Sequence, residues 1–83
     1  MAFQMVQLEQ ALVVAWRYGI VAPSPTKLGA LKTGDAVQVY RGAQQFWVRV
    51  MHARAGWVWG EVTSDDWAEW PRIGFSVACV VRV

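Results

Sequence analysis

The strongest constraint on the fold is an alternating pattern of apolar side chains between residues 46 and 63. One face of this pattern consists of Phe46, Val48, Val50, Val58 and Val62. Successive side chains of a strand point to opposite faces, so a period of two indicates two half-buried strands. Residues 54–56 between them end in a glycine, which suits a three-residue hairpin loop with a left-handed last residue. The segment therefore predicts an antiparallel hairpin.

The register of this hairpin follows from its loop. It sets Arg49 opposite Glu61 and Met51 opposite Trp59 on the face away from the valines. A cross-strand pair of opposite charge supports this pairing by roughly 0.2–1 kcal/mol. Gly60 falls on the valine face, where the missing side chain lets a neighbouring strand or a bulky residue come close.

Further strands are expected on both sides of the hairpin. Residues 35–40 alternate and are followed by a turn at 41–43, while 75–83 alternate with apolar residues on both faces. The second segment predicts a strand that is central or covered on both sides. Residues 64–69 predict one short helical turn that is capped by Ser64 and anchored by Trp67 and Trp70.

The N-terminal segment has a helical rather than an alternating pattern. Apolar residues at helical spacing predict an amphipathic helix over 3–18, with Trp16 in the core and Gly19 as the residue that ends the helix. Val13 and Val14 leave a strand over 11–18 as the alternative. A second apolar edge means that this helix packs against the sheet, another subunit or both. Two prolines indicate that 21–33 is a loop.

Several motifs in this order resemble a known type of domain. They are Leu31-Lys32-Thr33-Gly34-Asp35-Ala36-Val37, Phe46-Trp47-Val48-Arg49-Val50, Trp59-Gly60-Glu61-Val62 with Ser64-Asp65, and Gly74-x-x-Val77. Over residues 31–80 the chain is similar to small uncharacterised bacterial domains with an SH3-like β-barrel. The resemblance implies a fold and no activity, and the chain departs from the pattern in its extra tryptophans and in Phe75.

These features predict one mainly β domain with one N-terminal helix. Residues 1–20 form the helical segment, 21–33 the loop, and 34–83 a small SH3-like barrel or a strongly bent antiparallel sheet. The single cysteine, Cys79, excludes an intramolecular disulfide and is expected to be a buried apolar residue in a reducing, cytoplasmic setting. No secretory signal or membrane-spanning run is visible, so no membrane partner is expected.

Enzymatic chemistry finds little support in the residue types. One histidine, His52, and one cysteine at no ligand spacing argue against a zinc site, and Asp65, Asp66 and Glu69 suit the capping of a helical turn. No nucleophile–base spacing or phosphate-binding glycine motif is present. We therefore predict a protein that is not an enzyme and has no catalytic, cofactor or metal residues.

Protein interaction is the function that the composition favours. Six tryptophans and only 17% charged residues leave a surface too apolar to stay uncovered, which predicts a homodimer or a protein partner. The candidate interaction residues are Tyr40, Trp47, Arg49, Met51, Arg54, Trp57 and Trp59. Whether the chain's own helix, a partner or solvent covers the three hairpin tryptophans stays open at this point.

Nucleic-acid binding is the alternative. Basic residues interleave with the same aromatic residues, as in small barrels that bind single strands. They are Lys27, Lys32, Arg41, Arg49 and Arg54. A net charge of +2 and an acidic stretch over 61–69 weaken this interpretation.

Overall fold

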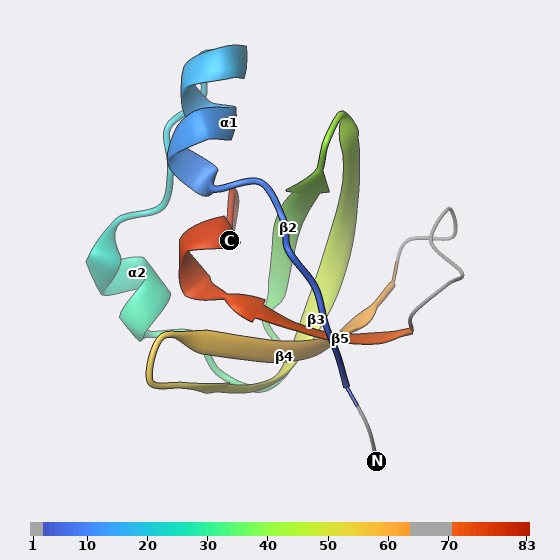
Figure 1. The fold of residues 1–83 in the computed structure, drawn as a ribbon. Coiled ribbons are helices and arrows are strands. Elements are labelled where there is room, and N and C mark those ends of the chain that lie inside the picture. The colour runs from blue at the N-terminus through green and yellow to red at the C-terminus, as the bar shows by residue number, and fades with distance from the viewer. Residues whose placement is uncertain (1–2, 64–70) are drawn as a thin grey trace.

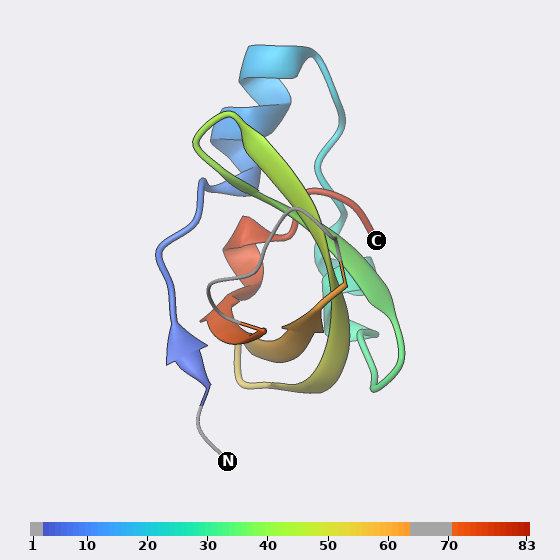
Figure 2. The ribbon, with the colours of Figure 1, turned by 90° about the vertical axis from the view of Figure 1, so that its right-hand side faces the viewer.

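A computed structural model of the chain describes residues 3–63 and 71–83 and confirms a mainly β fold (Figure 1). Five strands form one mixed sheet in the order β1-β5-β4-β3-β2. The strands are β1 (Gln4–Met5), β2 (Ala36–Arg41), β3 (Gln44–Arg54), β4 (Trp57–Val62) and β5 (Arg72–Ser76). The helices are α1 (Ala11–Tyr18), α2 (Pro25–Gly29) and the 3-10 turn η1 (Val77–Cys79). The strongly curled sheet is seen edge-on in Figure 2.

The central hairpin of β3 and β4 forms as its alternation predicts. Phe46, Val48 and Val50 are buried on the inner face, and Arg49 pairs with Glu61 in the expected register. The loop is shorter than expected, because only residues 55 and 56 lie outside the strands. Ala55 and Gly56 both have positive φ, 53° and 83°, as a two-residue hairpin turn with the right twist requires.

A bulge in β3 changes the pairing next to this turn. The expected pair of Met51 with Trp59 is wrong, because the register shifts after Val50 and brings His52 opposite Trp59. The carbonyl of Met51 accepts a hydrogen bond from the Thr33 hydroxyl at 3.0 Å, so the extra residue has a polar partner outside the hairpin. The alternation of one strand cannot reveal such a bulge, because the bond that stabilises it comes from a residue far along the chain.

The N-terminal helix is shorter than predicted. It begins at Ala11, whereas β1 pairs in parallel with β5 and the following residues run extended from β5 to β2. The backbone N–H of Val6 donates to Gly74, and that of Glu9 donates to Tyr40. These bonds to distant strands replace the helical bonds that the apolar spacing favours. The expected helix end is confirmed, since Gly19 adopts the left-handed conformation with a φ of 68°.

The C-terminal strand also differs from its prediction. It ends at Ser76, because the chain then turns through η1, where the Ser76 hydroxyl accepts a hydrogen bond from the N–H of Ala78. As expected, the strand is interior, between β1 and β4. Beyond η1 the chain returns to β2, where the N–H groups of Gln38 and Val81 donate to the carbonyls of Arg82 and Gln38. This isolated bridge leaves the five-stranded sheet open.

Two buried clusters hold these elements together. The larger lies inside the curled sheet, and the smaller joins α1 to β2 and the C-terminal residues through Ala11, Val14, Tyr40 and Val81. The predicted core position of Trp16 is wrong, since this side chain is 88% exposed. The predicted loop over 21–33 contains the short helix α2, which Ser24 caps by accepting from the N–H of Lys27.

Two further expectations concern other parts of the chain. The helical turn over 64–69 and the anchoring roles of Trp67 and Trp70 lie outside the described residues. Among the described residues, the helices are too short to cross a bilayer.

Candidate functional site

An ionic row crosses the outer face of the sheet. Arg49 Nη2 lies 2.8 Å from Glu61 Oε1, and Arg72 Nε lies 4.0 Å from Glu61 Oε2. The three residues face one another across β3, β4 and β5 because Glu61 pairs with Arg49 on one side and with Arg72 on the other. One carboxylate therefore lies between two guanidinium groups, and the row has one positive charge in excess.

An aromatic row lies beside the ionic row. It occupies the next outward-facing positions of the same strands toward the β3–β4 turn. The ring of His52 lies against that of Trp59, with centroids 5.4 Å apart and ring planes tilted by 32°. On the other side of Trp59, Gly74 leaves room for two side chains: a β-carbon there would lie 2.6 Å from Met5 Sδ and 2.9 Å from Trp59 Cδ1. The glycine thus leaves room over its backbone for both the indole of Trp59 and the thioether of Met5.

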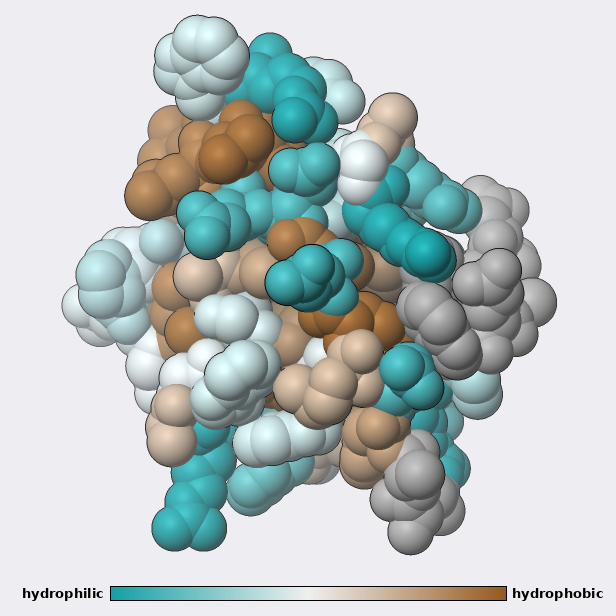
Figure 3. Space-filling model, in the orientation of Figure 1, coloured by the Kyte–Doolittle hydropathy of each residue, from teal (hydrophilic) through white to brown (hydrophobic). Residues whose placement is uncertain are grey.

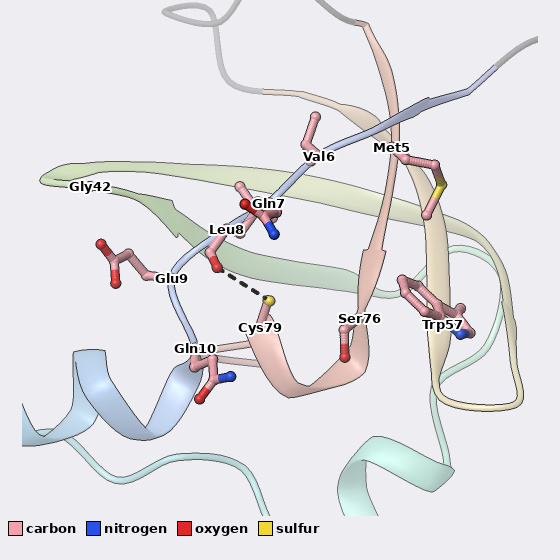
Figure 4. Close-up of a pocket in the computed structure, with 10 residues that line it drawn as sticks. All are labelled: Met5, Val6, Gln7, Leu8, Glu9, Gln10, Gly42, Trp57, Ser76 and Cys79. Atoms are coloured by element: carbon pink, nitrogen blue, oxygen red, sulfur yellow. Dashed lines mark hydrogen bonds between the residues drawn. The ribbon is translucent and has the colours of Figure 1, made fainter.

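Trp57 is the next outward residue of β4, and it stands between two hollows. It pairs with Arg54 on β3 and with Ser76 on β5, and its side chain is 45% exposed. One hollow, of about 570 Å³, is bordered by the extended segment 5–10 together with Ser76 and Cys79 (Figure 4). The other, of about 200 Å³, lies between the β3–β4 turn and α2. Trp57 is therefore the outer-face indole that a partner could contact from both sides.

The remaining candidate residues do not all join this site. Trp47 lies on β3 beyond the ionic row, where its carbonyl accepts from the N–H of Thr63 at 2.9 Å, and its side chain is 39% exposed. Tyr40 is buried beneath α1, with its ring 5.6 Å from that of Tyr18. Met51 is exposed at the bulge. The structure therefore brings together Arg54, Trp57 and Trp59 and separates them from Trp47 and Tyr40.

The chain's own helix does not cover these tryptophans. In both ribbon views α1 stands at the end of the molecule where the β2–β3 turn lies, while β4 lies at the opposite end (Figures 1 and 2). The buried face of α1 packs on Tyr40 and Val81. Of the three possibilities left open by the sequence, burial by the N-terminal helix is therefore wrong for Trp57 and Trp59.

Cys79 borders the larger hollow but is buried, as expected of an apolar residue. Its thiol lies 3.6 Å from the carbonyl of Leu8, to which it donates. Burial raises the pKa of the Cys79 thiol above its ordinary value. The thiol therefore stays protonated at neutral pH, the form that is a poor nucleophile.

Among residues 3–63 and 71–83, no three His, Cys, Asp or Glu side chains are grouped so that they could hold a metal ion. The acidic residues 65, 66 and 69 lie outside these ranges.

Sequence reasoning missed two components of the site. Met5 and the residues that follow it were assigned to a helix, so the position of Met5 over Gly74 and the border that residues 5–10 give to the larger hollow were not expected. The signal in the sequence was Gly74, whose missing side chain marks a close approach within a strand. Comparison with protein-family models, with curated protein sequences and with solved structures finds no match to this chain.

Proposed function

We propose that this chain is a non-enzymatic interaction module that binds a protein partner around Trp57. The observation that carries the proposal is the position of Trp57, which is partly exposed between two hollows and is not covered by the chain's own helix. Tryptophan and arginine are enriched at the energetic centres of interfaces, and Arg54 lies directly opposite Trp57.

The shape of the larger hollow favours an extended segment of the partner. Its border includes the extended residues 5–10 with the apolar side chains of Met5, Val6 and Leu8. A volume of about 570 Å³ is within the range of sites that hold small ligands or a few side chains. A short peptide could therefore place one or two apolar side chains beside Trp57.

Peptide selection tests this proposal directly. A random peptide library is panned against the full chain, and the selected peptides are titrated into the Trp57→Ala variant and into Trp16→Ala, a matched control on α1. We expect Trp57→Ala to weaken binding at least ten-fold, as the loss of an interface centre does, and Trp16→Ala to leave it unchanged. Equal binding to Trp57→Ala, or failure to select any peptide, would contradict the proposal.

Nucleic-acid binding is the second candidate, and the pairing of Arg54 with Trp57 favours it. Against it, Glu61 lies within 4.0 Å of both Arg49 and Arg72 and reduces the positive charge of the outer face. A titration of a fifteen-nucleotide oligothymidylate into the full chain at low salt separates the two functions. Quenching of tryptophan fluorescence that disappears with added salt and in Trp57→Ala would favour nucleic acid.

The proposed fold family is the SH3-like barrel. Four consecutive antiparallel strands, a 3-10 turn and a return of the chain to the first of these strands support it. In this proposal the bridge between Gln38 and Arg82 is the closing contact of the barrel, and the segment 5–10 covers the gap between β5 and β2.

A further inference from the structure

The two hollows beside Trp57 differ in charge. The larger is bordered by apolar side chains of the segment 5–10, and its charged residue, Glu9, lies at the end away from Trp57 (Figure 4). The smaller is lined by apolar residues of α2, β3, β4 and η1, and Arg54 is the one charged residue among its described lining residues. Figure 3 shows hydrophobic and near-neutral surface over the middle of this face and hydrophilic surface at its lower edge.

We propose that the peptide partner carries an acidic residue that binds Arg54, next to the apolar residue that contacts Trp57. This inference rests on the proposed peptide site, because an extended segment that crosses Trp57 places apolar side chains in the larger hollow and the acidic one at the smaller hollow. Arg54 and Trp57 lie directly opposite each other on paired strands, a position in which β-carbons are about 5 Å apart. Two neighbouring residues of the partner can therefore reach both side chains.

Arg54 has an unpaired charge. Its side chain is exposed, and it forms no ion pair within the described part of the chain. Glu9 and Glu61 form ion pairs with other arginines, and Asp35 accepts a hydrogen bond from a backbone N–H. The remaining acidic residues, 65, 66 and 69, follow the end of β4 that is farther from Trp57. An acidic side chain of the partner is therefore complementary to this end of the site.

The surroundings of Arg54 favour a single carboxylate. A guanidinium binds a carboxylate through two parallel hydrogen bonds, and the apolar lining of the smaller hollow reduces the screening of this pair by water. At about 200 Å³ the hollow is smaller than sites that enclose a small ligand, and it suits one side chain. A nucleic-acid strand needs a row of cations along its phosphates, whereas Arg49 and Arg72 share Glu61.

Parallel peptide selection tests the proposal. One random peptide library is panned against the full chain, against Arg54→Glu, and against Arg82→Glu, a matched charge reversal at a residue that lines neither hollow. We expect the full chain and Arg82→Glu to select peptides with Asp or Glu beside an apolar residue, and Arg54→Glu to select Lys or Arg at that position. In titrations, Arg54→Glu should bind the acidic peptides at least about ten-fold more weakly, because it replaces an attraction by a repulsion. The exposed position of Arg54 predicts that the variant stays folded, which its circular dichroism spectrum verifies.

The outcomes separate this proposal from the peptide site itself. Peptides that require Trp57 but contain no acidic preference, or that bind Arg54→Glu equally well, would overturn the acidic specificity and leave the peptide site in place. Equal weakening by Arg82→Glu would overturn it too, because the attraction would then be a property of the net charge. Failure to select any peptide would remove both proposals. Displacement of the peptides by a fifteen-nucleotide oligothymidylate that requires Arg54 and Trp57 would assign the site to nucleic acid instead.

Discussion

At the scale of single residues, two glycines of the sheet act through the space they leave. Gly74 admits Met5 and Trp59 on the outer face, and Gly60 admits Val48 on the inner face. A β-carbon at Gly60 would also collide with the backbone carbonyl of Arg49, which cannot move without breaking the pairing of β3 with β4. The close approach of the two central strands therefore requires a glycine at position 60.

We predict that Gly60→Ala lowers the free energy of unfolding by about 1–3 kcal/mol, the range found for overpacked cores. The matched control is Gly29→Ala in α2, where a β-carbon would meet no atom within 4 Å. It should leave stability unchanged or raise it by up to about 1 kcal/mol. Urea denaturation of both variants measures the free energy of unfolding. If Gly60→Ala is as stable as Gly29→Ala, β3 and β4 can move apart at no cost and position 60 does not require a glycine.

At the scale of elements, the β3–β4 hairpin combines an irregular strand with a tight turn. The bulge at Met51 moves His52 into the aromatic row, and the two-residue turn brings Arg54 opposite Trp57. Ala55 is the only non-glycine residue of the described chain with positive φ. The backbone of Ala55 is strained, because a left-handed conformation costs an L-residue roughly 1–2 kcal/mol.

Relief of this strain should stabilise the hairpin. Ala55→Asn forms the Asn-Gly sequence that such turns prefer, and we expect the free energy of unfolding to rise by about 0.5–1 kcal/mol. Ala43→Asn in the β2–β3 turn is the matched control, since Ala43 has an ordinary φ and should show no gain. Thermal unfolding followed by circular dichroism measures both changes. A gain at Ala43 alone would contradict the assignment of strain to Ala55.

At the scale of the whole molecule, α1 depends on β2 and on the C-terminal segment for its stability. It has eight residues and no side chain that caps its N-terminus, so it is too short to persist alone in water. Its inner face packs on Tyr40 from β2 and on Val81 from the C-terminal segment, which is hydrogen-bonded to Gln38. We therefore expect α1, β2 and the C-terminal segment to unfold as one unit.

Val81→Ala tests this cooperativity. We expect a loss of about 2 kcal/mol for the two missing methyl groups and the cavity that they leave. Val83→Ala, at a half-exposed position, should change stability by less than about 0.5 kcal/mol. Far- and near-ultraviolet circular dichroism should give coincident transitions in both variants. A helical signal that is lost before the near-ultraviolet signal would disprove the single unit.

Features with a local physical cause could be predicted from the amino-acid sequence. The alternation of residues 46–62 predicted the β3–β4 hairpin and the pairing of Arg49 with Glu61, and Gly19 predicted the end of α1. Strand periodicity and turn chemistry act over a few residues, so they can be read without a fold.

The conformation of the N-terminal segment and the burial of the tryptophans depend on contacts between distant parts of the chain. Residues 4–9 are extended because Gly74 and Tyr40 offer carbonyls to them, and Thr33 donates a hydrogen bond to the carbonyl of Met51 at the bulge. Trp16 has a helical spacing that suits a core, yet α1 turns its other face to Val81. These outcomes depend on contacts between residues far apart in the chain, and no local pattern specifies which of two apolar faces will find a partner.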